Sequence, residues 1–334
     1  MRAILVVLVL LGIGAWLYFR PHVGMCSGNG EIAAAEREDI DAAALAFVER
    51  LYGAQSEAAL DAMAPGAETP EVRAALVAVS QSVRAAPGDN RAVGERYRLL
   101  HLGPASGGTP CIDGESVVTL ANGGGMRTAV AVVTEALPGA AERSWTLWLA
   151  HERGDWRVRR FNVSLSGAAG GRADDLLAEA RRQERRGNAF NATLLYDMAG
   201  QLAYRGSFFQ SAIGNRVVGE RAAHRRHGDL PAEPPYRFTL GGRAYALQLV
   251  KVVGDGQGEL ALVLTQPAGA WRDANTAERS NRALIEAMNA HRGEWREAFD
   301  YIVVQTPMEQ PERSWGTVYR SEGRYVAARG QGAR

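Results

Sequence analysis

The chain has 334 residues, and its 38 lysines and arginines nearly balance 37 aspartates and glutamates, for a net charge of +1. This balance argues against a nucleic-acid-binding protein, which usually carries a strongly basic face. The length predicts about two domains beyond a membrane segment. Lys251 is the only lysine, and the many arginines, alanines and glycines indicate a GC-rich bacterial genome.

The first stretch, from Ala3 to Phe19, is apolar and uncharged. As a helix it would be about 25 Å long, which is at the short end of what crosses a bilayer. Trp16 and Tyr18 fall where interfacial aromatic residues belong, and Arg20 can reach the headgroups. The alternative is a cleaved signal peptide, but no small-x-small site follows directly. We therefore predict an uncleaved transmembrane anchor over residues 1–20, with residues 3–19 inside the membrane.

The charges beside this segment predict its orientation. Arg2 and the α-amino group precede it, whereas acidic residues from Glu31 to Asp41 dominate beyond it. Because positive charge stays in the cytoplasm, we expect a single-pass inner-membrane protein. Its N-terminus is then cytoplasmic and its C-terminal body is periplasmic.

Residues 21–38 are interpreted as a tether between the anchor and the body. The chain has two cysteines, Cys26 and Cys111, both beyond the anchor. An even number of cysteines in an exported chain favours one disulfide, although two unpaired thiols are the alternative.

Residues 39–166 are expected to form an α+β domain with its helices first. A stripe of apolar residues at helical spacing runs from Ile40 to Leu51, and another runs from Val72 to Val83. Four strands follow, separated by turn sequences, and strands so closely spaced predict an antiparallel meander. The expected strands are residues 116–121, 126–136, 143–152 and 156–165.

This order of helices and meander, with the last strand opening Gly-Asp-Trp-Arg-Val at residues 154–158, resembles the NTF2-like superfamily of cone-shaped α+β domains. The resemblance implies a curved antiparallel sheet. The superfamily includes isomerases, dehydratases, non-catalytic adaptors and dimerisation modules. Its enzymes use acidic residues or histidine inside the cone, and no such position can be matched in this sequence.

Residues 167–171 are rich in glycine and alanine, and they predict a flexible linker. Beyond it, residues 172–334 are interpreted as a helical hairpin followed by a small ββαββ layer. The expected helices are residues 174–186, 191–205, 208–227 and one capped by Asn275. The expected strands are residues 236–240, 245–253, 259–266, 301–305 and 315–319. The chain as a whole is thus assigned to the α+β class.

Few residues point to chemistry. No G-x-S-x-G, H-E-x-x-H, P-loop or S-x-x-K pattern occurs. His101 or His151 beside Asp113 or Glu115 is the one candidate acid–base pair.

Two further motifs are set aside. His224 and His227 share a helical face, but the arginines between them oppose a metal, so this stretch is interpreted as a basic helix end. The glycine-rich residues 254–258 fit a hairpin turn better than a phosphate loop. We therefore predict no cofactor and no metal.

The sequence favours a non-catalytic, membrane-anchored bacterial envelope protein that binds a protein partner or a small ligand. The alternative is an enzyme that uses the cone with a histidine and a carboxylate. A cavity that holds His101 or His151 beside a carboxylate would support the enzyme. A cone filled by Phe47, Trp145 and Leu149 would argue against it.

Overall fold

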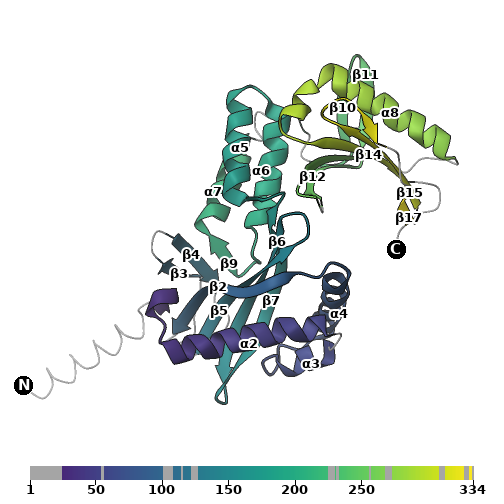
Figure 1. Cartoon of the computed structure of the whole chain (residues 1–334). Coiled ribbons are helices and arrows are strands. Elements are labelled where there is room, and N and C mark those ends of the chain that lie inside the picture. The colour runs from purple at the N-terminus through teal and green to yellow at the C-terminus, as the bar shows by residue number, and fades with distance from the viewer. Residues whose placement is uncertain are drawn as a thin grey trace, which may run out of the picture.

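The computed structural model shows a mixed α+β fold with a curled antiparallel sheet, a group of three helices and a second sheet (Figure 1). None of the helices in the described part is long and apolar enough to cross a membrane. The expected anchor, residues 3–19, lies outside the described residues. Those residues are 25–53, 56–100, 108–113, 116–121, 127–224, 230, 233–255, 257–267, 273–307, 313–326 and 331–332.

Residues 25–38, part of the expected tether, form a strand, a 3-10 helix and the first turn of a long helix. Ile32 is buried, and Cys26 lies in a strand that pairs with Leu99. Helix α2 begins at Ala34, ahead of the expected start. The elements of this part are β1 (Met25–Ser27), η1 (Asn29–Glu31), α2 (Ala34–Tyr52), α3 (Ser56–Asp61) and α4 (Pro70–Ala85).

Local sequence explains the buried face of α2 and the start of α4. Helix α2 buries Ile40, Phe47 and Leu51 along one stripe. Helix α4 begins where the Thr69 hydroxyl accepts a hydrogen bond from the Val72 amide across 3.3 Å.

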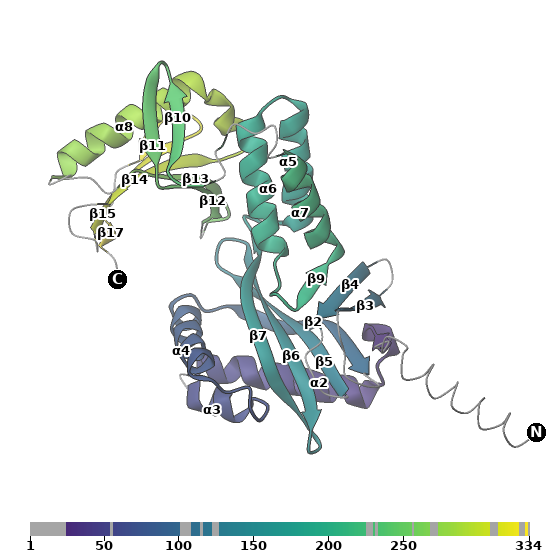
Figure 2. The same cartoon turned by 180° about the vertical axis from the view of Figure 1, so that it is seen from behind.

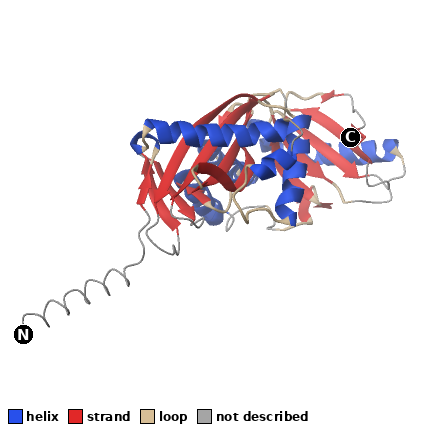
Figure 3. Ribbon diagram, turned by 90° about the horizontal axis from the view of Figure 1, so that it is seen from below, coloured by secondary structure: helices blue, strands red, loops and turns tan. Residues whose placement is uncertain are grey.

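The curled sheet lies against α2, which runs along one of its faces (Figure 3). Its strands follow the order β1-β2-β5-β6-β7-β8. Both faces are covered, so β5 is buried almost throughout and reads as a continuous apolar run. The long strand β2 has no counterpart in the sequence interpretation. The strands are β2 (Asp89–Leu100), β5 (Arg127–Leu137), β6 (Ala141–Glu152), β7 (Asp155–Ala168) and β8 (Gly171–Arg172).

The strand expected at residues 116–121 exists, but it does not belong to the meander. It is β4 (Ser116–Ala121), and it lies between β3 (Gly108–Asp113) and β9 (Phe209–Ser211) in a separate three-stranded sheet. The inner side of this small sheet packs on Trp148 and Tyr97, across the curled sheet from α2. A disulfide joins Cys26 in β1 to Cys111 in β3.

The residues expected as a linker form a tight turn. Gly167 pairs with Arg172 and Ala168 pairs with Gly171. Ala169 and Gly170 occupy the turn with φ angles of 51° and 75°. The division of the body into two separable domains stays a prediction.

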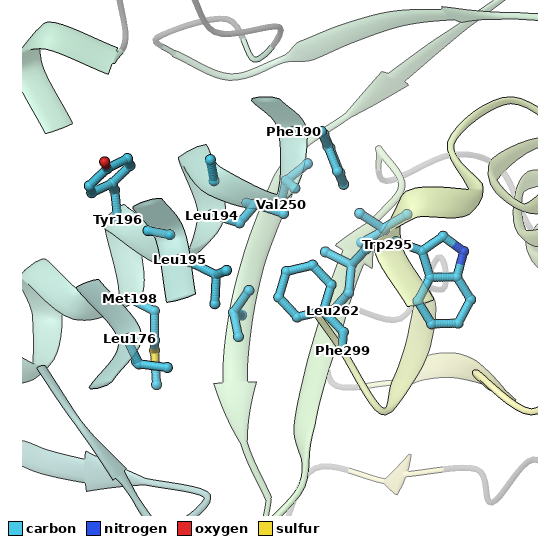
Figure 4. Close-up of a cluster of buried hydrophobic side chains, with 14 of the residues drawn as sticks. Leu176, Phe190, Leu194, Leu195, Tyr196, Met198, Val250, Leu262, Trp295 and Phe299 are labelled. Carbon is cyan, nitrogen blue, oxygen red and sulfur yellow. The ribbon is translucent and has the colours of Figure 1, made fainter. Parts of the chain in front are cut away.

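Beyond this turn the expected helical hairpin is present as α5 (Ala173–Arg185) and α6 (Ala189–Ala203), with α7 (Ala212–His224) beside α6. Helix α6 is buried on nearly all sides. Its Phe190 and Leu194 share one hydrophobic core with Val250 and Leu262 of the C-terminal sheet (Figure 4). The three helices therefore pack with the C-terminal layer.

The C-terminal layer is a sheet of order β12-β13-β14-β15-β16 with α8 against it (Figure 2). The parallel pair β13 and β14 is joined through α8, as a crossover requires. The expected strand 245–253 is divided in two near Gln248. The N-cap of α8 is Asp273, in place of the expected Asn275. The elements are β10 (Tyr236–Leu240), β11 (Arg243–Leu247), β12 (Leu249–Gly254), β13 (Leu260–Thr265), α8 (Ala274–His291), η2 (Gly293–Glu297), β14 (Tyr301–Pro307), β15 (Arg313–Arg320), β16 (Tyr325–Val326) and β17 (Gln331–Gly332).

Candidate functional site

The face of the curled sheet that α2 covers is filled with side chains. Phe47, Trp145 and Leu149 each have 0% of their surface exposed. The rings of Phe47 and Phe161 lie 5.7 Å apart between centroids. This packing occupies the space in which a cone-shaped enzyme would hold its substrate.

The expected acid–base pair is not assembled in the described part of the chain. His151 lies on β6 opposite Trp156, with the ring centroids 5.1 Å apart, and bonds to no described carboxylate. His101 and Glu115 lie outside the described residues, and only the backbone of Asp113 is described.

A buried carboxylate that the sequence interpretation missed lies on β5. Glu135 accepts hydrogen bonds from the Tyr52 hydroxyl at 2.7 Å and from Trp145 Nε1 at 2.9 Å. Nε of Arg143 lies 3.0 Å away and Nε of Arg91 lies 3.5 Å away. Burial, followed by the hydrogen bond to Glu135, raises the pKa of Tyr52 above its ordinary value.

This group around Glu135 is closed to ligands. A Cβ on Gly88 would come within 2.8 Å of the Glu135 Cδ atom, so the backbone of that loop lies directly on the carboxylate. Two arginines neutralise the charge of the carboxylate and two other donors satisfy its hydrogen bonds, so it needs no ligand as a partner. We interpret the group as structural.

A second buried polar group involves His224, which stands with Arg221 in the basic last turn of α7, as expected. His224 is 4% exposed. Its Nδ1 lies 2.9 Å from Glu184 Oε1, and its Nε2 lies 2.9 Å from the Thr193 hydroxyl. Thr193 is itself buried within α6, so this hydroxyl is not accessible to a substrate. His227 lies outside the described residues.

The feature best suited to hold a ligand is a cleft of about 400 Å³ between the curled sheet and the helices. Strands β2, β5, β6 and β7 form one side, and the start of α5, the end of α6 and β9 form the other. Apolar side chains and charges of both signs line it. The charged ones are Glu95, Glu142, Arg172, Asp174 and Arg205.

Arg205 is the distinctive member of this lining. It follows the end of α6, and its Nη1 donates to the backbone carbonyls of Leu202 at 2.5 Å and Tyr204 at 3.3 Å. Burial lowers the pKa of its guanidinium below the ordinary value, while the charges of Glu95 and Glu142 act in the opposite direction. Among the described residues, no carboxylate lies within ion-pair distance of it.

The two acidic residues whose charges act on Arg205, Glu95 and Glu142, already accept hydrogen bonds from other side chains. Glu142 accepts hydrogen bonds from Arg172 Nη2 and from the Ser166 hydroxyl, each at 2.7 Å. Glu95 accepts from the Tyr97 hydroxyl at 2.9 Å. The cleft thus holds a partly desolvated cation whose outer donors have no acidic partner in the described structure.

No local pattern could have identified this site, because its charged residues come from four distant parts of the chain. The described residues also contain no group of three or more metal-ligating side chains. No family model, no curated protein and no solved structure matches this chain.

Proposed function

We propose that this chain is a non-catalytic, membrane-anchored envelope protein whose body binds a small ligand with an anionic group in the cleft beside Arg205. The observation that carries the proposal is the partly buried guanidinium without an acidic partner among the described residues. A desolvated charge is costly unless a counter-charge reaches it. A ligand carboxylate would supply that charge and accept two parallel hydrogen bonds from the guanidinium.

The size and place of the cleft support a small ligand. Its volume of about 400 Å³ lies in the range of sites for small molecules, which favour junctions between structural units. Glu95 on the opposite side adds an acceptor, so the ligand that fits best has an anionic group at one end and a hydrogen-bond donor at the other.

The anchor over residues 3–19 and the periplasmic position of the body belong to the same proposal. They rest on the apolar segment and its flanking charges. The disulfide supports them, since such bonds persist in oxidising compartments. We also propose that residues 39–166 form an NTF2-like domain, because helices precede a curled sheet in this part of the chain.

The competing proposal, an enzyme that uses the cone, would need an open cavity beside His151. The buried Phe47, Trp145 and Leu149 weigh against it.

Thermal unfolding of the purified chain with succinate, citrate, glutamate and inorganic phosphate tests the binding proposal. At 100 times its dissociation constant a ligand stabilises the folded state by about 2.7 kcal/mol, which raises Tm by several degrees. We expect at least one of these anions to raise Tm in the parent and in Arg185→Gln, an exposed control on α5. The rise should vanish in Arg205→Gln. Equal shifts in all three proteins, or no shift in any, would contradict the site.

A further inference from the structure

Three exposed apolar side chains gather where the described chain begins. Met25 is 56% exposed, Ile112 is 68% exposed and Val117 is 44% exposed. Ile112 and Val117 are cross-strand partners in the hairpin of β3 and β4. The disulfide between Cys26 and Cys111 joins the neighbours of Met25 and Ile112. We name these three residues the hairpin patch.

The patch is unusual because the same hairpin is apolar on both faces. Its inner face carries Cys111 and Val118, which are buried against the curled sheet. A strand with one buried and one solvated face normally alternates apolar with polar residues. Ile112 and Val117 break that alternation on the outer face, which indicates that this face meets something other than water.

The length of the chain before the patch limits what that can be. From Phe19, where the apolar segment ends, to Met25 the chain can span at most about 20 Å. The Cα atoms of Cys26 and Cys111 are 5.2 Å apart, so the disulfide holds the hairpin close to the same point. Figures 1 and 2 both show β3 and β4 beside the first described elements. If residues 3–19 span a bilayer, the hairpin is held within reach of its surface.

We propose that the hairpin patch docks on the lipid surface of the membrane in which residues 3–19 are anchored. Interfacial burial of a few apolar side chains suits a patch of this size. Asp113 and Glu115 stand close to Ile112 and Val117 in the sequence, so zwitterionic headgroups suit the patch better than anionic ones. This inference rests on the anchor in the proposed function. Docking would set the orientation of the body on the membrane, which the anchor alone does not.

Tryptophan quenching in reconstituted vesicles tests the docking. The full chain is placed in phosphatidylethanolamine and phosphatidylcholine vesicles, with part of the phosphatidylcholine brominated on its acyl chains. Fluorescence is measured for the parent, for Ile112→Trp and for Val218→Trp, a control on α7 that is 63% exposed. Subtracting the parent removes the native tryptophans. We expect the fluorescence added by Ile112→Trp to be largely lost in brominated vesicles, and that added by Val218→Trp to persist.

Flotation of the vesicles distinguishes a failure of the docking proposal from a failure of the proposed membrane anchor. If the full chain does not float with the vesicles, the anchor is contradicted and the docking with it. If the chain floats and the Ile112→Trp signal is unquenched, the docking is overturned and the anchor is not. This holds even if a second copy of the chain or another protein covers the patch. Val117→Trp serves as a second reporter if Ile112→Trp does not fold.

Discussion

His224 Nδ1 lies 2.9 Å from Glu184 Oε1, and this contact links the end of α7 to α5. Because a carboxylate accepts hydrogen bonds, the Nδ1 atom of His224 carries the hydrogen. The opposite ring nitrogen meets the Thr193 hydroxyl inside α6. One imidazole ring thus joins all three helices of the group.

Replacing this ring should therefore loosen the three-helix group. We expect His224→Ala to lower the free energy of unfolding by roughly 1–3 kcal/mol, since it leaves buried polar partners unsatisfied. His291→Ala, at the exposed end of α8, is the matched control and should have little effect. Urea unfolding measures both, and equal stabilities would show that the buried contact contributes nothing.

The disulfide closes a long loop, with 85 residues of sequence separation between Cys26 and Cys111. In the chain-entropy model, a closure of this length stabilises the folded state by about 4.6 kcal/mol. The double variant Cys26→Ser/Cys111→Ser should lose a stability of that order, and reduction of the parent should have the same effect. Thiol labelling of the unfolded, unreduced protein should detect no free cysteine, whereas two labelled thiols would refute the pairing.

Glu36 makes part of the stability depend on pH. Burial opposes its ionisation, but Arg127 Nη2 at 2.8 Å and Arg98 Nη1 at 3.1 Å outweigh burial and hold its pKa below the ordinary value. A lowered folded pKa gives stability that is present above the unfolded pKa, about 4.3. This stability is lost as pH falls through the folded pKa.

We therefore expect Glu36→Gln to be less stable than the parent at pH 7, with the difference shrinking as pH falls below about 4. Glu49→Gln, on an exposed position of the same helix, should show no such dependence. Urea unfolding at several pH values measures the difference. A gap between parent and Glu36→Gln that stays constant with pH would contradict the argument.

Gly254 at the end of β12 lies directly on the turn that follows β7. A Cβ at this position would meet the Ala168 side chain at 2.8 Å. We expect Gly254→Val to cost about 1–3 kcal/mol, because overpacking forces the two segments apart. Gly316→Val, on strand β15 with open space around it, should be tolerated. Limited proteolysis near residues 167–171 should accelerate only in Gly254→Val, and equal digestion of both variants would indicate that this contact is not needed.

The proposed topology has a direct test. Alkaline phosphatase fused after Arg334 should be active, because it requires the oxidising periplasm to form its disulfides. A β-galactosidase fusion at the same position should be inactive, since it works in the cytoplasm. The reverse pattern would overturn the charge argument for orientation.

Features set by neighbours along the chain could be predicted from the sequence. The stripe from Ile40 to Leu51 specified α2, Thr69 specified the start of α4, and turns that contain Gly139 and Gly154 separated the strands β5, β6 and β7. The helical hairpin of α5 and α6 followed from the same helical periodicity. Each of these features depends on hydrogen bonds and contacts within a few residues, which the local pattern records.

Long-range pairing decided the rest. Strand β4 pairs with β9, about ninety positions away, and no local pattern reveals this partner. The first half of β2 lies at an edge of the sheet and carries charged and polar residues. The alternation of apolar and polar residues that marks a strand is therefore not visible there. Burial of Glu135 and His224 likewise depends on how distant elements pack, and so does the presence of Arg205, Glu95 and Glu142 in the lining of one cleft. The sequence by itself determined the apolar segment and most helices and turns, whereas only tertiary packing created the cleft, because its charges come from segments far apart in the chain.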